Sequence, residues 1–171
     1  MLVRPAAAQD LPAIQSIYAH HVLNGLASFE EEAPPLEEMR RRYEEIAGRG
    51  LPYLVAEEKG EILGYGYCSL YRARSAYRFT LEDSIYEKNG RQGKGIGKAL
   101  LAELIQRCEK LNYRQIVAVI GDSANAASIG VHASLGFVRA GNLRSTGYKF
   151  GRWVDSVYMQ LPLGTGDGTK P

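Results

Sequence analysis

The segment from Arg91 to Lys98 has glycine at every second position: Gly93, Gly95 and Gly97. It lies between a strand-like run, 80–87, and a run with helical periodicity. Glycine lets the backbone turn sharply and approach an anion closely. The first turn of the following helix adds unpaired N–H groups and the positive end of the helix dipole. The sequence therefore predicts a seat for a phosphate or pyrophosphate.

Two common phosphate-binding motifs do not fit this segment. A P-loop needs Gly, four residues, and then Gly-Lys followed by Ser or Thr, but Gln92 and Ala99 occupy the first and last positions. The dinucleotide fingerprint Gly-x-Gly-x-x-Gly, started at Gly93, needs its third glycine where Lys98 stands. The pattern that fits is Gln92-x-x-Gly95-x-Gly97, so chemistry on a nucleoside triphosphate is not expected.

The strand-like run before the loop contains two adjacent acids. Side chains alternate between the two faces of a strand. The expected faces are Glu82, Ser84 and Tyr86 on one side, and Leu81, Asp83 and Ile85 on the other. The two carboxylates are therefore expected to differ in solvation. Glu82 is either a catalytic carboxylate or an ordinary exposed one.

Asn125 and His132 are seven residues apart in a predicted helix. Seven residues return to nearly the same face, within about 20°, two turns along the axis. Both side chains can therefore face one ligand, and imidazole can donate or accept a proton near neutral pH. The ordinary alternatives are a helix histidine with satisfied hydrogen bonds and an asparagine that caps the helix.

Three arginines follow the second strand of a predicted hairpin and are interleaved with tyrosines: Arg72, Arg74 and Arg78, with Tyr71 and Tyr77. A planar guanidinium can hold a carboxylate or phosphinate through two parallel hydrogen bonds. The cluster therefore favours an acidic acceptor molecule. Solvated loop arginines are the alternative.

The 171 residues suit a single domain, expected over 1–161, with a flexible tail over 162–171. The 21 basic and 19 acidic residues give a net charge of +2, which disfavours a nucleic-acid partner. No apolar run approaches the roughly 20 residues of a membrane span, and no signal peptide is recognisable, so a cytoplasmic location is expected. Cys68 and Cys108 are expected to be free thiols, not a disulfide or metal site.

Hydrophobic periodicity predicts strands and helices in alternation. The expected strands cover 2–4, 52–58, 62–70, 77–87, 115–120, 137–148 and 153–161. Helices are expected after Asp10, after Pro34-Pro35, after the glycine-rich segment and after Asn125, the last of them closing at Gly136. Strands on both sides of a strand–loop–helix–strand unit predict an α/β (α+β) fold with a mixed sheet and helices on both faces.

The glycine-rich pattern and the order of elements resemble the GNAT superfamily of N-acetyltransferases over residues 1–161. Further segments are similar to one branch of it, the phosphinothricin and methionine sulfoximine N-acetyltransferases: 27–30, 80–86, 117–121, 125–132, 135–137 and 147–153. In the last of these segments, aromatic, glycine and cationic residues stand close together in the sequence. This composition indicates either a functional role or a bulge or bend in a strand. The resemblance implies a mostly antiparallel sheet of about seven strands.

The resemblance also implies acetyl-CoA as cosubstrate, with no metal. Its pyrophosphate would be held by the loop residues Gly93, Lys94, Gly95, Ile96, Gly97 and Lys98. Its pantetheine arm would be held by the backbone of Ile85, Tyr86 and Glu87 and by Asn125. An amine that attacks a thioester must lose a proton. The resemblance assigns the base to Glu82, acting through a water, and leaves His132 as acid, base or water-positioner.

The implied acceptor is a small amino acid-like compound, acetylated on its α-amine within a ternary complex and without a covalent acyl-enzyme. Residues implied to bind it are Phe29, Arg72, Ala73, Arg74, Glu82, Asp83 and Ser84. Two other hypotheses are a GNAT enzyme for a peptide N-terminus or a polyamine, and a CoA-binding module without turnover. The arginines oppose a polyamine. A homodimer is implied as well, with Phe150, Trp153 and Tyr158 as apolar surface.

Overall fold

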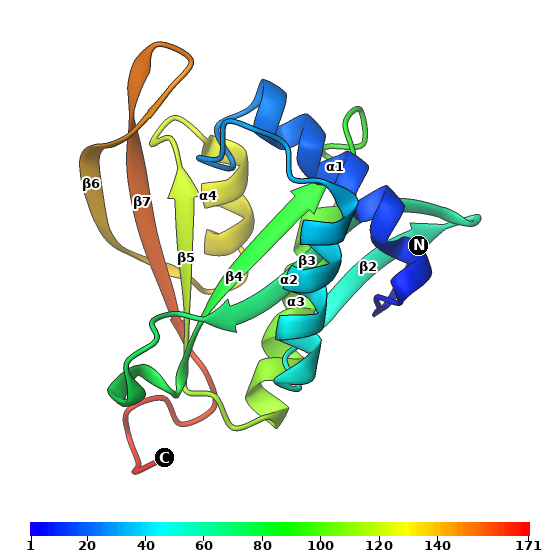
Figure 1. Cartoon of the computed structure of the whole chain (residues 1–171). Helices are drawn as coiled ribbons and strands as arrows, with labels where there is room; N and C mark the ends of the chain where they lie inside the picture. The colour runs from blue at the N-terminus through cyan, green and yellow to red at the C-terminus, as the bar shows by residue number, and fades with distance from the viewer.

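A seven-stranded sheet runs through the computed structural model of the chain, which describes residues 1–171 (Figure 1). The strands are β1 (Leu2–Pro5), β2 (Tyr53–Glu58), β3 (Glu61–Leu70), β4 (Thr80–Glu87), β5 (Gln115–Gly121), β6 (Val138–Lys149) and β7 (Arg152–Pro162). Their order is β1-β2-β3-β4-β5-β7-β6, and only the β4–β5 pair is parallel. The predicted mixed, mostly antiparallel sheet is confirmed.

Four α-helices cover the sheet: α1 (Leu11–Asn24), α2 (Leu36–Gly48), α3 (Ile96–Lys110) and α4 (Ala126–Ala133). Helices α1 and α2 pack on one face of the β2–β4 region, and α3 packs on the opposite face (Figure 1). Helix α4 lies beside α3 and contacts β5. Helices therefore cover both faces, as the sequence predicts.

The two faces of the sheet carry different side chains because strand residues alternate. On the α1 face, Tyr65 stacks on Tyr86 with a ring-centroid distance of 5.3 Å. On the α3 face, Gly66 leaves little room for a side chain, since a Cβ there would lie 3.2 Å from Leu104 of α3. Small residues on this face therefore let α3 approach the sheet closely.

Two predictions at the ends of elements need correction. The strand expected from Tyr77 begins at Thr80, because a short 3-10 turn, Ser75–Tyr77, precedes it. Asp10 stands immediately before α1 but does not cap it with its side chain. Its carboxylate accepts hydrogen bonds from the Arg4 guanidinium at 2.7 and 2.9 Å. These charge-assisted bonds are stronger than a bond to a helix amide.

The C-terminal region also differs in detail from the prediction. Helix α4 ends at Ala133, before the predicted Gly136. Strand β7 continues to Pro162, and the next residue, Leu163, is buried in the core. The Leu163 N–H donates to the Arg114 carbonyl at 2.9 Å. The first residues after position 161 therefore take part in the fold.

Candidate active site

A gap opens in the sheet where β4 and β5 diverge (Figure 1). Their pairing ends at Asp83 and Ala118. The Phe79 carbonyl, just before β4, points toward the β5 side, because it accepts a hydrogen bond from the Arg114 N–H at 2.9 Å. Every second residue of a strand directs its backbone N–H and C=O groups to the same side, so those of the odd-numbered residues of β4 point toward β5. The backbone groups of Ile85 therefore face the gap without a strand partner. A ligand with amide groups can pair with such an edge as an added strand does.

The gap holds a cavity of about 60 Å³ with walls from both strands, α4 and the α1–α2 loop. Residues that line it are Ala27, Asp83, Ser84, Ile85, Tyr86, Ala118, Val119, Ile120, Gly121, Asn125, Ser128 and His132. Six of them are residues singled out from the sequence. The predicted capping of α4 by Asn125 is confirmed, because its Oδ1 accepts from the Ser128 N–H at 3.1 Å.

The glycine-rich loop presents unpaired amides at the start of α3. Five of its N–H groups make no hydrogen bond within the protein: those of Gly93, Lys94, Gly95, Ile96 and Lys98. Gly93 and Gly95 have φ angles of 76° and 77°, in the left-handed region that favours glycine. Consecutive free amides, a helix N-terminus and exposed lysines together form a fitting seat for a diphosphate.

One amide of this loop already has a partner in the protein. The Gly97 N–H donates to Oε1 of Glu87 at 2.6 Å. A Cβ on Gly97 would lie 2.7 Å from the same oxygen. Glycine is therefore needed here for the approach of Glu87, and the Gly97 amide is not free for a phosphate in this structure.

Glu82 and Asp83 lie on opposite faces of β4, as alternation predicts. Glu82 is half-exposed and makes no hydrogen bond or ion pair with the protein. Burial raises the pKa of Glu82, the negative charge of Asp83 raises it further, and Arg72 lowers it in part. A free carboxylate with a raised pKa is suited to act as a general base.

His132 and Asp83 form a buried pair on the other face. His132 Nε2 lies 3.0 Å from Asp83 Oδ2, and Nδ1 lies 2.8 Å from the Ser128 carbonyl. Burial lowers the pKa of His132, but Asp83 and the Ser128 carbonyl together raise it by more, so the net shift is upward. Both contacts of the ring are with oxygen atoms that can accept a hydrogen bond, so they favour the protonated imidazole.

The arginine segment forms an exposed turn before β4. The Arg72 guanidinium lies over the Tyr71 ring at 4.9 Å, and its charge acts on Glu82. Neither Arg72 nor Arg74 pairs with a carboxylate of the chain. Ala73 lines a separate pocket beside the end of α2. The structure therefore brings Arg72 within electrostatic reach of Glu82, but it does not bring Ala73 or Arg74 to the gap.

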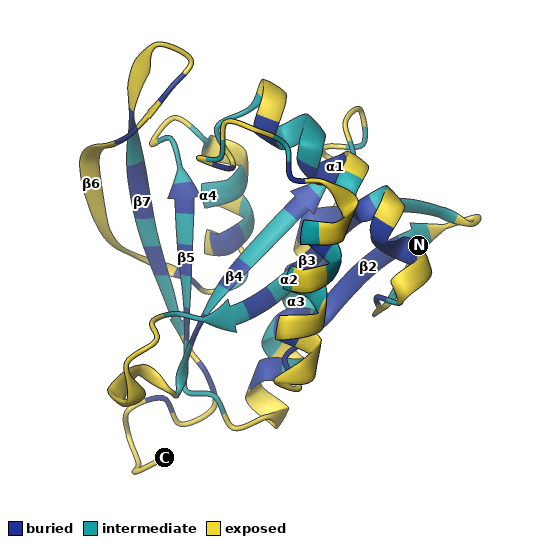
Figure 2. Ribbon diagram, in the orientation of Figure 1, coloured by how far each residue is buried: buried dark blue, intermediate teal, exposed yellow.

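The face that carries Glu82 continues as an open surface over β5 and β7. In the sheet register, Glu82 lies beside Val117, and Val117 lies beside Gln160. Tyr158 lies two residues from Gln160 on the same face, and all four side chains are half-exposed. No helix stands in front of β5 and β7 in Figure 2. An acceptor molecule therefore has access to Glu82 from this face.

Phe29 lies where the α1–α2 loop meets this open face. Its ring packs against Gly147, where a side chain would overlap it, and lies 3.1 Å from the position of a Cβ on Gly121. About 40% of Phe29 remains exposed. Ala27, two residues earlier, lines the gap. The loop thus connects the acceptor face to the gap.

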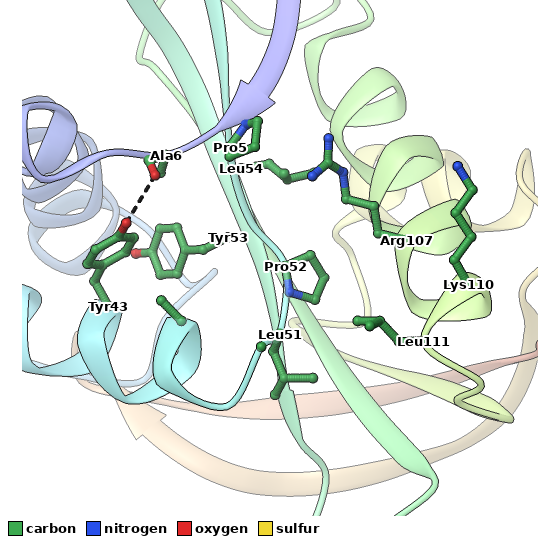
Figure 3. Close-up of a pocket in the computed structure, with 12 residues that line it drawn as sticks. Pro5, Ala6, Tyr43, Leu51, Pro52, Tyr53, Leu54, Arg107, Lys110 and Leu111 are labelled. Atoms are coloured by element: carbon green, nitrogen blue, oxygen red, sulfur yellow. Dashed lines mark hydrogen bonds between the residues drawn. The ribbon is translucent and has the colours of Figure 1, made fainter.

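A larger cavity, of about 410 Å³, lies away from the gap, among the end of α2, the start of β2 and the end of α3 (Figure 3). The Tyr43 hydroxyl donates to the Ala6 carbonyl at its rim, at 3.0 Å. Its lining has no carboxylate, histidine or cysteine and none of the predicted site residues. Size alone therefore does not make it the active site.

Two residues beside the site were not assigned from the sequence. His21 Nε2 lies 2.7 Å from the Glu87 carbonyl and fixes the end of β4. Burial lowers the pKa of His21, and a neutral ring can donate this bond. No local pattern distinguishes His21 from other polar residues of α1. Lys149, in contrast, belongs to the 147–153 segment, whose unusual composition did mark it.

The fold, the gap between β4 and β5 and the amide-rich loop define an acyl-CoA-dependent transferase. Residues 3–158 match the family model of the acetyltransferase (GNAT) domain. The chain belongs to the GNAT superfamily, and it is an N-acetyltransferase.

Individual relatives narrow the similarity. The chain is 57% identical to phosphinothricin N-acetyltransferase of Alcaligenes faecalis over 169 residues, 99% of this chain and 86% of that protein. It is 40% identical over 162 residues to an L-methionine sulfoximine/L-methionine sulfone acetyltransferase of Pseudomonas aeruginosa, 94% of each chain. Its structure matches a GNAT phosphinothricin acetyltransferase of Sinorhizobium meliloti in complex with AcCoA, with a TM-score of 0.96, 50% identity and coverage of 99% and 92%.

Two further observations concern metal-ion sites and membrane-spanning helices. No three His, Cys, Asp or Glu side chains are grouped so that they could hold a metal ion. None of the helices combines the length and apolar character that crossing a bilayer requires.

Proposed function

We propose that this chain is a cytoplasmic enzyme that acetylates the α-amine of small amino acids of the phosphinothricin and methionine sulfoximine class, with acetyl-CoA as donor. The observation that carries the proposal is that two different surfaces border the same strand, β4. One is the gap with its unpaired backbone and free loop amides, and the other is the open face with an unpartnered carboxylate. Donor and acceptor can therefore approach the same strand from different sides.

On the donor side, the residues present fit acetyl-CoA. The amides of Gly93–Ile96 and Lys98 would hold the pyrophosphate, with Lys94 and Lys98 adding charge. The backbone at Ile85 and the amide of Asn125 would hold the pantetheine arm. When bound, acetyl-CoA supplies an acetyl group activated as a thioester.

On the acceptor side, Glu82 acts as the base. Its carboxylate takes a proton from the amine, through a water, so that nitrogen can form the new bond to the acetyl carbon. The contacts of His132 with Asp83 and with the Ser128 carbonyl favour its protonated form, which suits an acid better than a base. In this proposal His132 gives a proton to the departing thiolate. Cys68 and Cys108 are fully buried, so transfer is direct and no acyl-cysteine forms.

The acceptor carboxylate is held by Arg72, which lies within electrostatic reach of Glu82, with Phe29 as a wall of the site. The planar guanidinium donors match a carboxylate or phosphinate, whereas a polyamine would be repelled. A peptide N-terminus, which lacks the adjacent carboxylate, would lose the same contacts. These charges favour a zwitterionic amino acid over both alternatives.

A panel of acceptors tests the proposal. Methionine sulfoximine, methionine sulfone and phosphinothricin should be acetylated, and spermidine and a short peptide should be poor acceptors. Arg72→Lys should raise KM for the amino acids about 10-fold while acetyl-CoA binding is spared, since a bidentate contact worth roughly 1–2 kcal/mol is lost. Arg139→Lys, an exposed arginine on β6, is the matched control. Efficient turnover of spermidine, or no turnover of any amine, would refute the proposal.

A further inference from the structure

Lys149, the last residue of β6, has a buried charge with an unusual set of partners. Only 1% of the residue is exposed. Its ammonium group donates to the Gly25 carbonyl at 2.9 Å and to the Ser28 carbonyl at 2.8 Å, and it pairs with no carboxylate. Burial lowers the pKa of Lys149, and the more distant charges of Glu31 and Glu30 offset part of this shift. A buried charge without an ion-pair partner is costly, so packing alone does not explain a lysine here.

The residues that follow Lys149 hold it in this position. Phe150 and Gly151 have φ angles of 53° and 72° and make the two-residue turn that joins β6 to β7. Arg152, on the far side of the turn, pairs with Asp122 at 2.8 Å in the loop between β5 and α4. The hairpin is therefore anchored to the site from both of its strands.

The segment that Lys149 holds is the loop that joins the gap to the acceptor face. Gly25 and Ser28, its two carbonyl partners, enclose Ala27, which lines the gap. Phe29 follows immediately and lies against Gly147 of the same strand as Lys149. The same side chain thus fixes both ends of the short loop 25–28, directly beside Phe29.

We propose that Lys149 is a positioning residue that holds the 25–29 loop in place as a wall of the acceptor site. It does not touch the reacting atoms. Its two hydrogen bonds keep Phe29 over Gly147 and keep Ala27 at the gap, so the acceptor finds a preformed surface. This inference rests on the proposed function, because it assigns the acceptor to the face beside Phe29.

Lys149→Met tests the inference, since methionine preserves an unbranched chain but cannot donate the two hydrogen bonds. The KM for the amino acid acceptor should rise about 10-fold or more, because the acceptor would then meet a loop that the two charge-assisted bonds no longer hold in place. The Kd for acetyl-CoA should stay within about twofold. Hydrogen exchange of amides 26–30 should become faster, while exchange in the sheet is unchanged. Arg139→Met removes an exposed cation from the same strand and should match wild type in every measurement.

Gly147→Ala provides a second, independent variant that displaces Phe29 and leaves Lys149 intact. It should also raise acceptor KM and spare acetyl-CoA binding. Wild-type acceptor KM and loop exchange in either folded variant would overturn the inference. So would a parallel loss of acetyl-CoA binding with faster exchange throughout the sheet, which indicates a general structural role. If the wild-type protein acetylates no amino acid, the proposed function fails, and loop exchange still tests the hold of Lys149 on the loop.

Discussion

Glu82 and Asp83 are neighbours in sequence, and β4 gives them different chemistry. Asp83 is 6% exposed and bound to His132, whereas Glu82 is half-exposed and unpartnered. Adjacent residues on a strand face opposite sides, so one carboxylate can join a buried pair while the other meets the acceptor. The raised pKa of Glu82 follows from its partial burial and from the charge of its neighbour.

At this scale we predict that Glu82→Gln lowers kcat by about 100-fold or more, the usual contribution of a general base, and leaves acetyl-CoA affinity nearly unchanged. Glu82 works in its ionised form. The rate should therefore be full above its raised pKa and should fall as pH decreases through that pKa. Steady-state kinetics over a pH series measure both effects.

Arg72 supplies a further check on this assignment, because its positive charge lowers the pKa of Glu82. Arg72→Met should move the acidic limb of the kcat/KM profile to higher pH. Arg139→Met, with its cation on β6, should leave the limb in place. An acidic limb that survives unchanged in Glu82→Gln would contradict the role of Glu82 as the base.

Among the secondary-structure elements, the start of α3 contains two glycines that are needed for different reasons. Gly95 has a φ of 77° with open space around it, whereas Gly97 has no room for a Cβ beside Glu87. A substitution at Gly97 would disturb the Glu87 hydrogen bond as well as the loop. Gly95 therefore gives the cleaner test of cofactor binding.

We predict that Gly95→Ala weakens acetyl-CoA binding about 10-fold or more, because the left-handed backbone that exposes the loop amides is unfavourable for alanine by roughly 1–2 kcal/mol. Gly90→Ala is the matched control, since Gly90 has a φ of 76° and equally open surroundings outside the loop. Both variants should lose similar stability, and only Gly95→Ala should lose affinity in calorimetry. Equal affinities in the two variants would show that the loop does not hold the cofactor.

The elements themselves were largely predictable from the sequence because hydrophobic periodicity is a local property. The glycine-rich loop, the faces of β4 and the capping by Asn125 depend on residues close together in the chain. The gap between β4 and β5 was not predictable by periodicity, since paired and unpaired ends of a strand have similar residues. The contact of Lys149 with Gly25 spans 124 positions, so no local pattern reveals its partner.

At the scale of the whole molecule, the strand order leaves β6 at one edge of the sheet. This long strand and its neighbour expose a set of apolar side chains: Val138, Leu143, Tyr148, Phe150 and Trp153. Tyr158, which the sequence analysis grouped with them, is half-exposed on the inner acceptor face instead. An unpaired edge strand with exposed aromatic residues is typical of a surface that meets another chain.

We therefore predict that the protein forms a homodimer through the β6–β7 hairpin. Trp153, with 64% of its surface exposed, is the strongest candidate for a central contact. Sedimentation at micromolar concentration should give twice the chain mass of 18.9 kDa. Trp153→Lys should weaken association about 30-fold or more, because an aromatic anchor worth roughly 2 kcal/mol is lost. Leu2→Lys, at the 61% exposed Leu2 on the opposite edge strand, should leave the dimer intact. A wild-type protein that remains monomeric would contradict the predicted dimer. A Trp153→Lys variant that associates as the wild type does would show that Trp153 is not at the interface.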